Sequence, residues 1–185
     1  DEKKVMDYFR MVLNLPSRKI FHNAMYDVCF IRAAGLKING MIVDTMIAGS
    51  LVDENRFRYD LGSMGRDYLG RGKNEAVLNE TAALWGVDPK SEMYKLPAMY
   101  VGGYAEQDAN LTLKLWQEMK KQMYHEDVED IFKLETELFP CLVDMRFLGV
   151  RVDTEAAYTL KQQLIEEEKE CLQKIKTETS VDVQI

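Results

Sequence analysis

The spacing of apolar residues predicts a helix at the start of the chain, followed by two short strands. Over residues 2–14 apolar positions recur every three or four residues, which is the period of an amphipathic helix. Pro16 follows its end and cannot continue it. The apolar runs KIF (19–21) and MIV (41–43) are short, and each predicts a buried strand.

A helix is predicted after each strand. Asn23 directly follows the first strand and is a preferred N-cap residue, so we expect its side chain to cap a helix that runs to about Ala34. Gly35 closes that helix. Asp44 follows the second strand and caps a helix to about Val52. Strand, helix, strand and then several helices is an α/β pattern.

The remainder of the chain predicts helices alone. Helical periodicity covers 60–69, 75–84, 97–123, 127–147 and 154–178. Gly102–Gly103 could break or kink the third of these helices. In the last one, we expect an inner stripe made of Leu160, Leu164 and Leu172.

The two ends of the chain suggest a piece of a longer protein. The sequence begins without Met inside a predicted helix, and it ends on the alternating run SVDVQI, which is typical of a strand being entered. Two strands are also few for a twisted sheet. We therefore expect an incomplete sheet, whose missing strands would precede residue 19.

Composition and charge restrict the class of protein. Apolar residues make up 46% of the sequence and charged residues 30%, as in ordinary globular proteins. The net charge of −7 argues against a simple electrostatic clamp on duplex DNA. It is compatible with a site of carboxylates and divalent metals, which is acidic until the metals bind. The three cysteines form no CxxC pair, so we expect a reducing cytosolic setting. No apolar run is long enough to span a membrane.

Two pairs of polar residues stand at predicted helix starts. Asn23 and Asp27 are four residues apart, and so are Tyr104 and Asp108, so each pair shares a helix face. A helix start after a buried strand is where open α/β sheets place their sites. The alternative is that Asn23 only caps its helix and Asp27 only complements the helix dipole.

Two carboxylates and a tyrosine suit metal-assisted phosphodiester hydrolysis. Two divalent ions can hold both the attacking and the leaving oxygen. Carboxylates are ligands that magnesium prefers. A tyrosine hydroxyl can orient the attacking water by hydrogen bonding.

Both pairs lie in recognisable motifs. HNAMYD (22–27) resembles the second motif of the proofreading 3′–5′ exonucleases, and YAEQD (104–108) resembles the third. Together they resemble the tyrosine-bearing branch of the four-carboxylate (DEDD) superfamily. The surrounding stretches IVDTMIAGSLVD, RYDLGSMGRDYLG and LETELFPCLVDMRFLGVRVD are similar to family A DNA polymerases, above all those of bacteriophages.

The resemblance implies a ribonuclease H-like exonuclease fold, truncated at its N-terminal strands and followed by helices that lead into a polymerase domain. Residues 1–125 would be the exonuclease domain, and 126–185 the start of the polymerase domain in the same chain. The substrate would be a single-stranded DNA 3′ end, and the cofactors two Mg²⁺ (or Mn²⁺) ions. A phage-encoded protein of this kind would act in the cytoplasm of the bacterial host.

The resemblance also implies roles for individual residues. Asp108 would be a direct metal ligand, and Asp27 would serve the second metal through water. Tyr104 would orient the nucleophilic water, Asn23 would contact the terminal nucleotide, and Arg58 would contact a backbone phosphate. Asp44 is expected to be structural, as a helix cap.

One departure from the family pattern limits the expected activity. The first motif, an Asp-x-Glu on a strand, has no counterpart before Asn23, so half of the carboxylates are missing. We expect the chain alone to be an inactive or weak nuclease. The strand edge at 19–22 would lack its partner, which predicts self-association there.

Two other functions stay open. A ribonuclease D-type RNA 3′ exonuclease shares both motifs, although LFPCLVDMRFLGVRVD argues against it. A non-catalytic domain that only packs against a polymerase is the second alternative, and the presence of Asp27, Tyr104 and Asp108 together argues against it for the parent protein.

Overall fold

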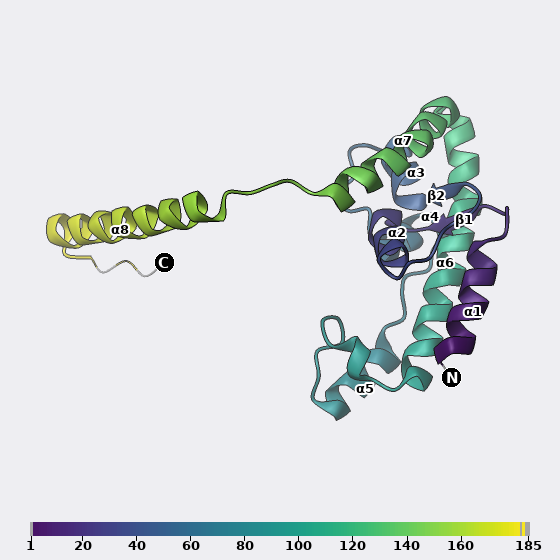
Figure 1. Cartoon of the computed structure of the whole chain (residues 1–185), viewed down its shortest axis with the longest axis horizontal. Coiled ribbons are helices and arrows are strands. Elements are labelled where there is room, and N and C mark those ends of the chain that lie inside the picture. The colour runs from purple at the N-terminus through teal and green to yellow at the C-terminus, as the bar shows by residue number, and fades with distance from the viewer. Residues whose placement is uncertain (1, 182, 184–185) are drawn as a thin grey trace. The chain divides into compact units, whose positions relative to one another are not determined.

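The computed structural model describes residues 2–181 and 183, and the chain divides into two compact units, 1–147 and 148–185 (Figure 1). The final strand expected over SVDVQI includes residues 182, 184 and 185, which lie outside the described residues.

The first unit contains two strands and most of the helices of the chain. In order these are α1 (Glu2–Leu13), β1 (Lys19–Phe21), α2 (Ala24–Ala33), β2 (Ile42–Asp44), α3 (Thr45–Val52), α4 (Leu61–Leu69), α5 (Ala76–Trp85), the short 3₁₀ helix η1 (Met93–Lys95), α6 (Ala98–His125) and α7 (Glu129–Leu148). The expected elements are therefore present within a few residues of their predicted bounds. The second strand begins one residue later than MIV predicts.

The sheet of the described residues has two parallel strands. Lys19 pairs with Ile42, and Phe21 pairs with Asp44. Both strands therefore end at the same edge of the sheet, and α2 and α3 begin there. No further strand pairs with β1 in the part of the chain that the structure describes, so the sheet is small, as expected. Self-association through β1 stays a prediction.

Helix α6 forms the centre of the main core. Its buried side chains pack with those of α3 and α4, and the buried set is Val43, Ala48, Leu61, Met64, Leu111, Leu115, Trp116, Met119, Met123 and Phe132. The expected break at Gly102–Gly103 is absent, because α6 continues through both glycines. A glycine costs a helix only about 1 kcal/mol relative to alanine, which the packing of α6 outweighs.

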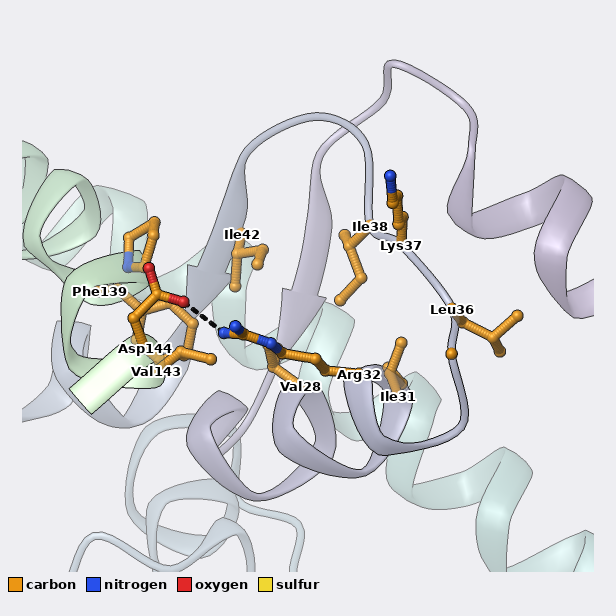
Figure 2. A pocket seen from close by; sticks show the side chains of 12 residues that line it. Val28, Ile31, Arg32, Leu36, Lys37, Ile38, Ile42, Phe139, Val143 and Asp144 are labelled. Carbon is orange, nitrogen blue, oxygen red and sulfur yellow. Dashed lines mark hydrogen bonds and ion pairs between the residues drawn. The ribbon is translucent and has the colours of Figure 1, made fainter. Parts of the chain in front are cut away.

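Helix α7 packs on α2 and encloses a small hollow of about 450 Å³ (Figure 2). Phe139 and Val143 are buried against Val28 of α2. Arg32 and Asp144 form an ion pair across the hollow, as Figure 2 shows. Residues 129–147 of α7 therefore belong to the first compact unit.

The second unit consists mainly of α8 (Thr154–Thr179). Asp153 caps this helix and accepts a hydrogen bond from the Ala156 N–H at 2.9 Å. None of its described residues is buried, and Leu160 and Leu164 are each 54% exposed. Within this unit, the described residues therefore do not bury the expected inner stripe. Among the described residues, no helix combines the length and the apolar character that crossing a membrane would need.

Candidate active site

The carboxylate of Asp44 joins the starts of α2 and α3. It accepts hydrogen bonds from the backbone N–H groups of Asn23 (3.0 Å), Ala24 (2.7 Å) and Met46 (2.8 Å). The first N–H groups of a helix have no partner inside the helix, so a buried carboxylate satisfies them well. Asp44 is only 6% exposed. The expectation of a structural, helix-capping Asp44 is confirmed.

The expected N-cap residue of α2 is confirmed as Asn23, but the expected capping by its side chain is not observed. Asn23 occupies the N-cap position, but its side chain makes no capping hydrogen bond, and its φ of 64° is left-handed. Asparagine tolerates this conformation better than most residues. The carboxylate of Asp44, twenty residues further along the chain than Ala24, caps α2 instead. Asn23 is exposed beside the start of the helix.

An open cleft of about 890 Å³ lies beside these helix starts. Asn23 and Asp27 line it from α2, and Tyr104 and Asp108 line it from α6. The two pairs that sequence spacing singled out, about 80 residues apart in the chain, thus lie on the walls of one cleft. Phe9, His22, Asp60 and Lys73 are further lining residues.

Arg58 is the one predicted site residue that does not line the cleft. It is exposed in the loop before α4. It lies near Asp60, whose carboxyl pKa is lowered chiefly by the hydrogen bond from Ser63, with weaker help from the charges of Arg66 and Arg58. A phosphate contact of Arg58 stays a prediction.

His22 is held in a neutral state at the end of β1. The Thr45 hydroxyl donates to the Phe21 carbonyl oxygen at 3.1 Å, so we assign the Nδ1 proton to His22, which donates to Thr45 at 2.9 Å. Burial lowers the pKa of His22 despite the nearby Asp44 charge. Its Nε2 is buried without a hydrogen-bond partner.

Lys73 contacts both predicted site residues of α6, Tyr104 and Asp108. Its ammonium donates to the Tyr104 hydroxyl oxygen at 3.0 Å and to Asp108 Oδ2 at 2.6 Å. Burial alone acts to lower the pKa of Lys73, but its hydrogen bonds to Asp108 and Tyr104 outweigh burial and raise the pKa. Burial also raises the pKa of the Tyr104 phenol, so this side chain is a neutral hydroxyl at neutral pH.

The residues of the cleft fit a divalent cation in part. Asp108 Oδ1 is buried and has no hydrogen-bond partner, which leaves a carboxylate oxygen available for a cation. Asp27 supplies a second carboxylate on the same cleft. No group of three or more His, Cys, Asp or Glu residues suited to a metal occurs among the described residues.

Asp27 carries an electrostatic cost in the absence of a cation. Its carboxyl pKa is raised, first by burial and then by the charge of Asp44. A raised folded-state pKa means that ionised Asp27 opposes folding. The cost is absent below the unfolded-state pKa and grows as the pH rises through the folded-state pKa.

Asp27→Asn is therefore expected to raise the free energy of unfolding at neutral pH. The increase should be only about 0.5 kcal/mol, because Asp27 is partly exposed and its charge is screened by water. The gain should vanish near pH 3.5, below the unfolded-state pKa of about 3.9. Urea unfolding in EDTA at both pH values measures it, with Glu80→Gln on exposed helix surface as control. An equal gain at both pH values would contradict this origin.

The sequence of this chain is similar to those of known exonucleases and DNA polymerases. A profile of the 3′–5′ exonuclease family matches residues 1–124. A DNA-directed DNA polymerase of Pseudomonas phage M6 is 31% identical over 85% of this chain, and DNA polymerase DpoZ of Acinetobacter phage SH-Ab 15497 is 29% identical over 77%. DNA polymerase I of Chloroflexus aurantiacus is 28% identical over 74%. The chain spans 24% of each phage protein and 14% of the bacterial one.

The two parallel strands end beside a cleft that is lined by carboxylates, and a helix begins after each strand. This arrangement is that of an α/β protein, in which ligands bind at the strand ends. The chain belongs to the 3′–5′ exonuclease family found in family A DNA polymerases. That family implies a ribonuclease H-like fold, of which the described residues contain a small parallel sheet and its covering helices.

Sequence analysis missed Lys73, whose ammonium contacts Tyr104 and Asp108 in the cleft. It lies in the run GRGKN, between α4 and α5, where no periodicity marks a functional residue. Its partners are 31 and 35 residues further along the chain. A lysine between glycines and asparagine in an otherwise polar loop was the only available signal.

Proposed function

We propose that this chain is the proofreading 3′–5′ exonuclease part of a family A DNA polymerase, and that it hydrolyses the last phosphodiester bond of a DNA 3′ end. The observation that carries the proposal is the meeting of Asp27, Tyr104 and Asp108 on one cleft, in a chain that belongs to the exonuclease family.

Each of the predicted site residues has a role in this reaction. Asp108 binds one divalent ion directly, and its unpartnered Oδ1 supports this role. Asp27 serves the second ion through water. When bound, the ions, Mg²⁺ or Mn²⁺, stabilise the charge of the attacking and leaving oxygens. Tyr104 keeps its proton and orients the attacking water, while the exposed Asn23 amide and Arg58 contact the terminal nucleotide and a phosphate.

The upstream Asp-x-Glu strand of the family would complete the site. With only two of four carboxylates, the 185-residue chain holds divalent ions weakly and is a poor nuclease. Residues 1–125 then form the exonuclease domain and 126–185 the first helices on the polymerase side, in a protein that works in the cytoplasm of a bacterial host.

Two alternative functions remain testable. A ribonuclease D-type enzyme would cut RNA in preference to DNA with the same residues. A non-catalytic scaffold would not cut either nucleic acid, even with the upstream strand in place. The polymerase names of the relatives favour DNA as the substrate.

The test compares the 185-residue chain with a chain extended upstream by an Asp-x-Glu strand. Single-stranded DNA and RNA of equal length, labelled at the 5′ end, are incubated with Mg²⁺. We expect the extended chain to shorten DNA progressively from its 3′ end, and the 185-residue chain to do so slowly or not at all.

Two other results would decide against the proposal. Faster shortening of RNA than of DNA would favour the ribonuclease D-type function, and no shortening by the extended chain would favour a scaffold. Brisk digestion by the 185-residue chain that Asp108→Ala abolishes would show that the upstream carboxylates are dispensable.

A further inference from the structure

The ammonium group of Lys73 contacts two side chains of α6 that line the cleft. It is 3.0 Å from the Tyr104 hydroxyl oxygen and 2.6 Å from Asp108 Oδ2. The side chains of Lys73 and Asp108 are only 25% and 22% exposed. Water therefore screens this ion pair much less than it screens the surface pairs of the chain.

The backbone around Lys73 is fixed by the end of α4. Gly70 adopts a left-handed φ of 64°, and its N–H donates to the Arg66 carbonyl oxygen at 3.0 Å, as in an αL cap. The next N–H, of Arg71, donates to the Gly65 carbonyl oxygen at 3.1 Å. A Cβ at Gly65 would lie 2.6 Å from the Arg71 carbonyl oxygen and 3.1 Å from Leu111. Glycine at position 65 thus allows α4 to lie close both to the loop that carries Lys73 and to Leu111 of α6.

The hydrogen bond from Lys73 determines the hydrogen-bonding role of the Tyr104 hydroxyl. An ammonium group has three donors and no acceptor, so the Tyr104 oxygen must be the acceptor in this pair. The phenol proton is then left for a different acceptor, such as a carboxylate or a water in the cleft. A tyrosine that orients a water molecule needs an O–H bond with a fixed direction, and the hydrogen bond from Lys73 restricts that direction.

The same ammonium neutralises Asp108. A divalent cation at Asp108 must share or displace Lys73, because both cations are attracted to the same carboxylate. The unpartnered Oδ1 lets a cation approach while Lys73 remains on Oδ2. Lys73 therefore lowers the affinity for cations and, at the same time, holds the hydroxyl and the carboxylate in place.

We propose that Lys73 is a positioning residue of the exonuclease site, which orients the Tyr104 hydroxyl and Asp108 and competes with divalent cations for Asp108. The proposal rests on the proposed function, since it takes Asp108 as a metal ligand. Two results are therefore expected together. Loss of the Lys73 charge tightens cation binding, and it slows hydrolysis.

The first arm of the test measures Mn²⁺ binding to the 185-residue chain by electron paramagnetic resonance of the free ion. Lys73→Met is expected to bind Mn²⁺ roughly tenfold more tightly than the unchanged chain, because a unit positive charge next to the ligand is lost. Lys73→Arg keeps the charge and should bind as the unchanged chain does. Lys121→Met, which removes an exposed lysine of α6 paired with Glu118, is the control.

The second arm measures 3′-end hydrolysis by the upstream-extended chain. Lys73→Met should slow hydrolysis at least tenfold at saturating Mn²⁺, and Lys73→Arg should restore part of the rate. Lys73→Gln, which keeps a donor without the charge, provides a second neutral variant should Lys73→Met fold poorly. Its Mn²⁺ affinity should rise as in Lys73→Met.

Unchanged or weaker Mn²⁺ binding in both neutral variants would overturn the proposal. So would tighter binding that persists when Asp108→Asn is added to Lys73→Met, because the competition would then lie elsewhere. A different result would contradict the proposed function alone. In that case the extended chain with Lys73 intact does not hydrolyse DNA, although the neutral Lys73 variants bind Mn²⁺ more tightly.

Discussion

Asp108→Asn is expected to slow 3′-end hydrolysis by roughly 10³-fold or more in the upstream-extended chain. The change keeps the shape of the side chain and removes the charge that binds the ion. Divalent ions supply several kcal/mol of transition-state stabilisation, and each 1.36 kcal/mol corresponds to tenfold in rate. The rate is measured from the shortening of 5′-labelled single-stranded DNA with Mg²⁺.

The matched control for Asp108→Asn is Glu106→Gln. Glu106 is an exposed acid on the same helix, two residues earlier and on a different face. It does not line the cleft, so its loss should leave the rate within about twofold of the unchanged chain, as is usual for exposed charges away from a site. Equal losses of rate in the two variants would show that general acidity of α6, rather than the Asp108 carboxylate, supports hydrolysis.

Asp44→Ala is expected to lower the free energy of unfolding by about 3–5 kcal/mol. The change leaves the N–H groups of Asn23, Ala24 and Met46 without an acceptor, and each buried unpaired N–H costs about 1–3 kcal/mol. The loss also frees the start of α2, which carries Asp27. Urea unfolding followed by circular dichroism measures the effect.

Asp60→Ala is the control for capping alone. Asp60 caps α4 by accepting from the Ser63 N–H at 3.0 Å, but it is exposed, so its loss should cost only about 1 kcal/mol. If Asp44→Ala cost no more than Asp60→Ala, the three hydrogen bonds to Asp44 would not be what fixes the two helix starts.

The periodicity of the sequence predicted the elements because their patterns are local. The helices over 2–14 and 154–178, for example, lie within a residue of the observed bounds. Spacing also placed Asn23 with Asp27, and Tyr104 with Asp108, on shared helix faces. That both faces line one cleft depends on the packing of α6 beside β1, which spacing alone does not contain.

The missed features depend on contacts between distant residues. Propensity favoured the Asn23 side chain as a cap, but the left-handed backbone of Asn23 and the remote carboxylate of Asp44 give α2 a different cap. Lys73 reaches Tyr104 from a glycine-containing loop that lies close against α4. In α8 the apolar spacing predicted the stripe of Leu160 and Leu164, but periodicity does not supply a partner that covers it.

The most direct measurement of the central claim is paramagnetic broadening of backbone amide NMR signals of the 185-residue chain by added Mn²⁺. We predict that the signals around Asp27 and Asp108 broaden together at the lowest Mn²⁺ concentrations, and that Asp108→Asn removes this broadening. The two carboxylates would then share one cation-binding cleft. Broadening that starts instead at the acidic run 166–170 of α8, with Asp27 and Asp108 unaffected, would contradict the account.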